Sequence, residues 1–93
     1  MNKFLISDAI IKRVNAARKV DYGLWRIGIT NEISRRAAEH KDEDENIKYG
    51  LYWQTDSLSD AQEIESYFIN TMGMQGGTGG NLDASEPVFV YIF

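Results

Sequence analysis

A histidine and an arginine share the apolar face of a helix that the sequence predicts over residues 32–41. Arg36 and His40 are one helical turn apart, on the same arc as Ile33 and Ala37. Charged groups turned inward beside small apolar residues indicate a cleft. In such a cleft the guanidinium could stabilise a phosphate and the imidazole could position a water molecule. The alternative is that His40 is a hydrogen-bonded structural residue.

A glutamate repeats this pattern in a helix predicted over residues 60–72. Glu65 lies inside the apolar stripe of that helix, which is formed by Ala61, Ile64, Phe68 and Met72. A carboxylate in an apolar stripe is costly unless it is paired with a cation or binds a metal ion. One carboxylate, together with water and a substrate phosphate, suits Mg²⁺, so the three polar side chains could cut a phosphodiester. The alternative is that Glu65 lies at the rim of the stripe and forms a salt bridge with an arginine.

The composition excludes several other kinds of site. The chain has 93 residues, no cysteine and one histidine. Disulfides, a cysteine nucleophile and a multi-histidine zinc site are therefore excluded. A membrane-spanning helix needs about 18 consecutive apolar residues, and no apolar run in the sequence is nearly that long. No signal-peptide pattern is present either. We therefore expect a soluble, cytoplasmic protein that folds as a single domain over residues 1–93.

Charge is divided unevenly along the chain. Residues 1–41 carry nine basic and four acidic side chains, whereas residues 42–93 carry one basic and ten acidic ones. The net charges are therefore +5 and −9, which give the overall −4. The first segment could present a basic face to nucleic acid, and the second could suit a basic protein partner. The alternative is that the two segments attract each other within the molecule.

The apolar pattern predicts an α+β fold, in which helices and strands alternate along the chain. Strands are expected at 24–30, 47–54 and 88–93, and helices at 8–20, 32–41 and 60–72. We expect a small, three-stranded, mainly antiparallel sheet packed with three helices. Ser7 is expected to cap the first helix, the segment 59–62 to open the third, and Gly73 to end it. A monomer and a homodimer both fit the sequence, because strand 88–93 could pair with a second copy if it lies at a sheet edge.

Three segments resemble the GIY-YIG nuclease superfamily. The family's second motif strand and the helix after it are similar to Arg26-Ile27-Gly28-Ile29-Thr30-Asn31, followed by Arg35-Arg36 and His40. The helix of the family's catalytic glutamate resembles the segment with Ala61, Glu65, Phe68 and Ile69. The segment that carries the family's polar asparagine is similar to the glycine-rich stretch that ends at Asn81. The resemblance covers about residues 24–82, so the helix at 8–20 is an addition to the family's domain.

The sequence departs from the family in two places. Arg26 stands where the family's Tyr-Ile-Gly motif has its tyrosine, and arginine does not act as a base near neutral pH. No strand corresponding to the family's first motif, Gly-Ile-Tyr, precedes residue 24. Strand 88–93 resembles that missing strand, with Tyr91 in the place of its tyrosine, so the chain could be circularly permuted. This arrangement requires Tyr91 and Arg26 to face the helix of Glu65.

The resemblance implies an endonuclease that hydrolyses phosphodiesters of nucleic acid with Mg²⁺ or Mn²⁺. It implies four catalytic residues, namely Arg36 on the phosphate, His40 as an auxiliary group, Glu65 as the metal ligand and Tyr91 as the phenol. We expect the substrate-binding surface to include Arg26, Arg35, Tyr52 and Asn81.

The alternative is a catalytically inactive GIY-YIG-like binding module, such as a small phage or mobile-element factor that acts on a protein partner. The acidic pI, near 4.8, and the loss of the motif tyrosine favour that alternative.

Overall fold

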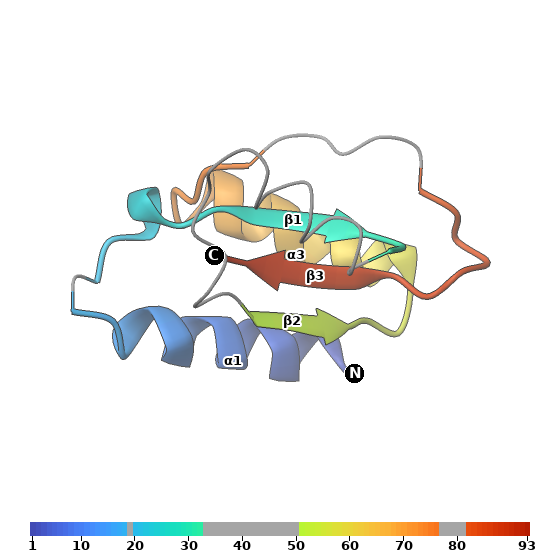
Figure 1. Cartoon of the computed structure of the whole chain (residues 1–93), viewed down its shortest axis with the longest axis horizontal. Coiled ribbons are helices and arrows are strands. Elements are labelled where there is room, and N and C mark those ends of the chain that lie inside the picture. The colour runs from blue at the N-terminus through green and yellow to red at the C-terminus, as the bar shows by residue number, and fades with distance from the viewer. Residues whose placement is uncertain (19, 33–50, 77–81) are drawn as a thin grey trace.

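The computed structural model describes residues 1–18, 20–32, 51–76 and 82–93. The elements in these ranges are, in chain order, α1 (Lys3–Asn15), the 3-10 helix η1 (Tyr22–Leu24), β1 (Ile27–Thr30), β2 (Leu51–Gln54), α3 (Leu58–Asn70) and β3 (Phe89–Ile92) (Figure 1). The three strands form one antiparallel sheet, which confirms the expected α+β class. The helix expected at 32–41 and the first half of the strand expected at 47–54 lie outside the described residues. No helix in the described part of the chain is long and apolar enough to cross a membrane.

The last strand of the chain is the central strand of the sheet. β3 pairs with β1 on one side and with β2 on the other, so the strand order is β1–β3–β2. The two ladders place Tyr91 between Gly28 and Tyr52. Because a central strand has no free edge, the condition under which strand 88–93 could pair with a second copy is not met.

One face of the sheet packs against both helices, and we call it the core face. Its buried side chains are Ile27, Ile29, Val90 and Ile92. Each helix covers this face with three buried residues at helical spacing, and these six are Ile6, Ile10, Val14, Ala61, Ile64 and Phe68. In Figure 1, α3 lies behind β1 and β3, and α1 runs along the β2 side of the sheet. Burial of these apolar groups is the main favourable contribution to the stability of the fold.

The opposite face of the sheet carries the side chains that alternate with the core residues. Paired residues of an antiparallel sheet lie on the same face, and successive residues lie on opposite faces. Gly28, Tyr52 and Tyr91 are paired in register, so they share this second face, which we call the tyrosine face. Phe89 and Phe93 lie two residues from Tyr91 along β3 and therefore belong to it as well.

The first helix begins five residues before its expected start. Asn2, not Ser7, is its N-cap, and the Asn2 side chain accepts a hydrogen bond of 2.7 Å from the backbone N–H of Phe4. The helix extends this far because Ile6 continues the buried spacing of Ile10 and Val14. It ends at Asn15, and η1 then occupies the start of the segment expected to form the strand 24–30.

The third helix also begins earlier than expected. Ser57 is its N-cap, and its hydroxyl accepts a hydrogen bond of 3.1 Å from the backbone N–H of Asp60. The expected opening at residues 59–62 is therefore two residues too late, because both serines are compatible with the local pattern. The helix ends at Asn70, and Gly73 follows with a φ of +89°, a conformation that glycine adopts without strain.

Replacing the two serines separately tests which one caps α3. We expect Ser57→Ala to lower the free energy of unfolding by about 1 kcal/mol, because an N–H of the first turn loses its acceptor. Ser59→Ala should change it by less than about 0.5 kcal/mol, since Ser59 is an exposed residue inside the helix. Urea unfolding followed by circular dichroism measures both values. An equal loss in the two variants would contradict the assignment of the cap.

Candidate functional site

Four of the expected site residues lie in the described part of the chain. They are Arg26, Tyr52, Glu65 and Tyr91. The other four, Arg35, Arg36, His40 and Asn81, lie outside the described residues. The geometry of the candidate site is therefore built from the tyrosine face of the sheet and from the flank of α3 that carries Glu65.

Tyr91 is held against the backbone of Gly28. The two residues are directly opposite in the β1–β3 ladder, and a Cβ atom on Gly28 would overlap the Tyr91 hydroxyl oxygen and Cζ. The phenol ring thus crosses the space that any other residue at position 28 would fill. It also stacks on Phe93, with ring centroids 6.0 Å apart and ring planes 9° apart, and Tyr91 is only 8% exposed. The glycine of the Arg-Ile-Gly segment therefore has a packing role, and the phenol is rigidly placed.

Arg26 and Tyr52 flank this phenol on the same face. The backbone of Arg26 continues the β1–β3 ladder through two hydrogen bonds with Phe93, of 2.8 and 3.1 Å. Strand alternation then puts the Arg26 side chain on the face of Gly28. Tyr52 is paired with Tyr91 in the β2–β3 ladder, and its ring meets that of Phe89 edge-on at 6.2 Å. The tyrosine face thus brings together a guanidinium and two phenols.

Tyr91 and Arg26 point away from α3, which covers the core face. The circular permutation was expected to turn both side chains toward the helix of Glu65, and in this respect the expectation is wrong. The physical reason is the alternation within each strand. Residues 26 and 28 alternate with Ile27 and Ile29 along β1, and Tyr91 lies between Val90 and Ile92 along β3. Phe93 is a further member of the tyrosine face. The alternation of aromatic residues at 89, 91 and 93 is the sequence signal that identifies it.

Glu65 lies on the flank of α3 that borders the outer edge of β1. The other flank of the helix, with Ile64 and Tyr67, faces α1. Glu65 shares its flank with Ile69, one turn further on, and a Cβ on Gly76 would meet the Ile69 side chain at 2.8 Å. The residue before Gly76, Gln75, is hydrogen-bonded to the start of β1, since its carbonyl accepts from the Ile27 N–H at 2.9 Å. Glu65 therefore lies on the same flank of α3 as Ile69, the flank that faces away from α1.

The Glu65 carboxylate is partly buried without compensation. Its Oε2 is buried and has no hydrogen-bond partner. Every other buried side-chain nitrogen or oxygen in the described residues has a partner. Burial removes water from the carboxylate and so raises the pKa of Glu65 above its ordinary value of 4.5. No ion pair joins it to a described arginine, whereas Glu63, two residues earlier, pairs with Lys3 at 2.7 Å. A buried polar atom that gains nothing from its surroundings is a mark of functional sites.

The described residues offer one candidate metal ligand rather than a complete metal site. They contain no group of three or more histidine, cysteine, aspartate or glutamate side chains that could surround an ion. A single carboxylate such as that of Glu65 can supply one ligand position of Mg²⁺, a cation that keeps several water molecules in protein sites. An Mg²⁺ ion at this position would therefore have one protein ligand, Glu65, and its other ligands would be water and substrate.

Part of the charge division is used inside the molecule. Besides the Lys3–Glu63 pair, the N-terminal amine pairs with Asp56 at 2.9 Å. Both pairs join the basic first segment to the acidic second one, as the alternative to a nucleic-acid face predicts. Arg13 lies over the ring of Trp25, 5.0 Å from its centroid. Lys12 and Arg18 are exposed.

Substituting Gly28 tests the contact with Tyr91. We expect Gly28→Ala to destabilise the protein by about 1–3 kcal/mol, because the added methyl group overlaps the phenol ring. In a Tyr91→Val background the same substitution should cost at least about 1 kcal/mol less, since the overlapping atoms are gone. A double-mutant cycle from urea unfolding measures the coupling. Equal costs in the two backgrounds would show that the ring does not occupy this space.

Substituting Glu65 tests the burial of its carboxylate. Because the folded pKa is raised, the folded protein binds more protons than the unfolded one between pH 4.5 and that raised pKa. Stability is then lost as the pH rises through this window. We expect Glu65→Gln to be more stable than the parent at pH 7, and the difference to vanish below pH 4.5.

Thermal unfolding at pH 4 and pH 7 measures this difference. Glu63→Gln is the matched control on the same helix, and it should be slightly destabilising at pH 7, because it breaks an exposed ion pair. If Glu65→Gln is less stable than the parent at pH 7, the carboxylate has a stabilising partner and its burial is compensated.

No protein-family model, curated protein or solved structure matches the chain. The similarity to the GIY-YIG superfamily therefore rests on the residues quoted above.

Proposed function

We propose that the chain is a GIY-YIG-like domain that hydrolyses phosphodiesters of nucleic acid with a divalent metal ion. The observation that carries the proposal is the register of β1 and β3, in which Tyr91 lies across Gly28. In the resembled family the two motifs lie in neighbouring strands. A circularly permuted chain needs its last strand beside the Arg-Ile-Gly strand, and β3 is the antiparallel neighbour of β1.

The orientation of Glu65 and Arg26 suggests where a substrate would lie. Among the described strands, β1 is at the edge of the sheet, and Gln75 pairs with its first residues on the outer side. Glu65 lies on the core side of β1 and Arg26 on the tyrosine face. A nucleic-acid backbone that passes this edge beyond Gln75 can contact the carboxylate on one side and the guanidinium on the other. Arginine at this position binds a phosphate but cannot remove a proton from water. Arg26 is therefore not assigned the role of proton acceptor that the family's tyrosine could have.

The other roles follow the resemblance. Glu65 would hold Mg²⁺ or Mn²⁺ through its carboxylate, and the ion would supply charge stabilisation at the phosphate. Arg36 binds the non-bridging phosphate oxygens, and His40 positions the attacking water. Tyr91, held by Gly28 and Phe93, keeps a fixed hydroxyl on the tyrosine face, the face on which Arg26 lies. Arg35, Tyr52 and Asn81 contribute to substrate binding.

A second candidate is a catalytically inactive binding module that acts on a protein partner. The observation that favours it is the orientation of Tyr91 and Arg26, which face away from α3 and leave Glu65 without them. Burial, which raises the pKa of Glu65, also removes water from around its carboxylate. The acidic composition, with a pI near 4.8, suits a basic protein partner.

Incubation with DNA separates the two candidates. Purified protein is mixed with supercoiled or single-stranded DNA in the presence of Mg²⁺, Mn²⁺ or a chelator. We expect metal-dependent nicking that Glu65→Ala and Arg36→Ala each reduce by about 10²–10³-fold, because each removes a group that acts on charge in the transition state. Glu63→Ala is the matched control and should cut at the parent rate, since Glu63 is on the other flank of α3.

Two results would count against the nuclease. If Glu65→Ala is folded by circular dichroism and cuts as the parent does, the activity does not depend on this carboxylate. If the parent neither cuts nor binds DNA, the binding module is the better description. DNA binding by phosphate contacts should also weaken steeply as salt is raised.

A further inference from the structure

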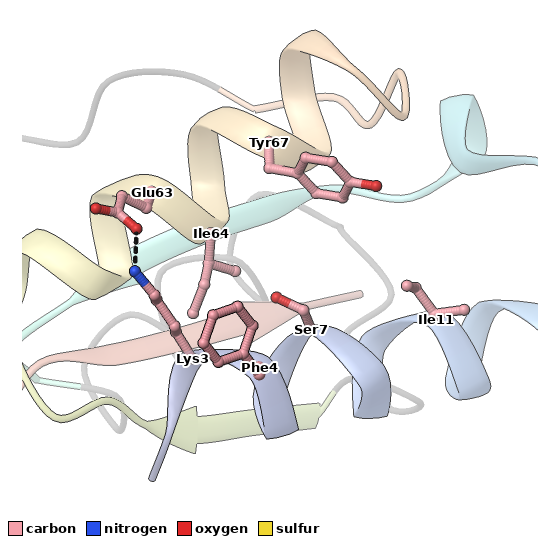
Figure 2. Close-up of a pocket in the computed structure, with 7 residues that line it drawn as sticks. All are labelled: Lys3, Phe4, Ser7, Ile11, Glu63, Ile64 and Tyr67. Atoms are coloured by element: carbon pink, nitrogen blue, oxygen red, sulfur yellow. Dashed lines mark hydrogen bonds and ion pairs between the residues drawn. The ribbon is translucent and has the colours of Figure 1, made fainter.

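A groove of about 350 Å³ lies between α1 and α3. Phe4, Ser7 and Ile11 line it from α1, and Ile64 and Tyr67 line it from α3 (Figure 2). At one end the side chains of Lys3 and Glu63 form a salt bridge of 2.7 Å across the groove. The groove is therefore mainly apolar along its length and closed by a polar contact at one end.

Large apolar side chains at this groove are exposed to solvent. Phe4 is 69% exposed and Tyr67 is 44% exposed, and the next residue of α1, Leu5, is exposed as well. The buried side of the same helix is already filled by Ile6, Ile10 and Val14, so the exposed ones are additional to what the fold requires. Removing apolar surface from water is favourable, and exposed apolar patches mark interaction sites.

The two ends of α1 carry opposite charge. Near the Lys3 end are three carboxylates, of Asp56, Asp60 and Glu63, while Lys3 and the N-terminal amine are the cations that pair there. Toward the other end Lys12 and Arg18 are exposed, and no described carboxylate lies within ion-pair distance of either. Residues 51–76, which include α3, hold no basic residue. Asp56 and Glu63 are paired with those two cations, so Asp60 is the excess carboxylate at the Lys3 end, while the other end of α1 is basic.

We propose that this groove is the interface of a symmetric homodimer, in which Phe4 of each copy packs into the groove of the other. A two-fold interface uses the same patch on both copies, so the patch must be complementary to itself. With the two α1 helices antiparallel, Phe4 of one copy lies beside Ser7 and Ile11 of the other. Lys12 of each copy then lies toward the Asp60 end of the other.

The patch meets this requirement in both its apolar and its charged parts. Its apolar middle supplies a protruding ring and a groove to receive it. Its ends supply charges of opposite sign at positions that an antiparallel pairing brings together. A second copy of the chain presents the complement to both features. This inference does not depend on the proposed function, since neither Glu65 nor the tyrosine face takes part in the interface.

Sedimentation equilibrium of the full chain tests the dimer. We expect a reversible monomer–dimer equilibrium, in which Phe4→Ser weakens association at least about tenfold by removing the ring that enters the groove. Leu24→Ser is the matched control, because Leu24 is 63% exposed but lies in η1, outside the groove. It should leave the dissociation constant unchanged. Thermal unfolding checks that both variants are folded.

Charge reversal tests the orientation of the two copies. Lys12→Glu and Asp60→Lys should each weaken self-association, because each places like charges at the ends of the interface. Mixing the two variant chains should restore association between them, since each end then pairs opposite charges again. Restoration only on mixing is a result that a change in fold would not produce.

Three results would overturn the proposal. The first is a chain that stays monomeric at concentrations up to about 1 mM. The second is a dimer that Phe4→Ser and Leu24→Ser weaken equally, which would place the interface elsewhere. The third is a dimer in which the mixed charge variants associate no better than each alone, which would exclude the antiparallel arrangement. A monomeric chain would leave the groove to a different partner protein.

Discussion

The fold depends on the two hydrogen-bonded ladders of β3. In the described part of the chain, β1 and β2 are both paired in the sheet through β3, which residues 89–92 supply. The ladders continue beyond the strand at both ends. Arg26 and Phe93 exchange backbone hydrogen bonds, and the amide and hydroxyl of Thr55 both donate to the carbonyl of Val88. Because these pairs join residues far apart in sequence, the sheet forms only when most of the chain is ordered, which is typical of slower-folding topologies.

The central place of β3 also determines where chemistry can occur. A phenol on a central strand, packed across Gly28 and stacked on Phe93, has little freedom, which suits a group that must hold a substrate in one position. Glu65 is in the opposite situation, because it lies at an edge, half-buried, with an unpaired oxygen. One group contributes rigid placement and the other an uncompensated charge. The edge strand β1 lies between them, and for this reason the proposed substrate path follows that edge.

Local patterns predicted the elements, but not how they are assembled. The alternation at residues 27–30 and 51–54 and the stripe of Ala61, Ile64 and Phe68 are local, and they were sufficient to predict the α+β class. The cap at Ser57 could not be separated from Ser59, because either serine suits the first turn. The central position of strand 88–93 and the face of Tyr91 depend on pairing partners, and a shift of one residue in register reverses the face. Whether the carboxylate of Glu65 has a partner depends on its neighbours in space. Its position in the apolar stripe of the helix was therefore compatible with a salt bridge and with a metal site.

The central claim is that Glu65 is a metal ligand, and carboxyl-carbon NMR tests it most directly. The side-chain carboxyl signals of Glu65 and Glu63 are followed as Mg²⁺ is added in the presence of a short DNA strand, at a pH above the raised pKa of Glu65. Our interpretation predicts that the Glu65 signal moves with Mg²⁺ while that of Glu63, which is paired with Lys3, does not. A Glu65 signal that responds to pH but not to Mg²⁺ would contradict the claim. In that case the buried carboxylate is a site of strain and not of catalysis.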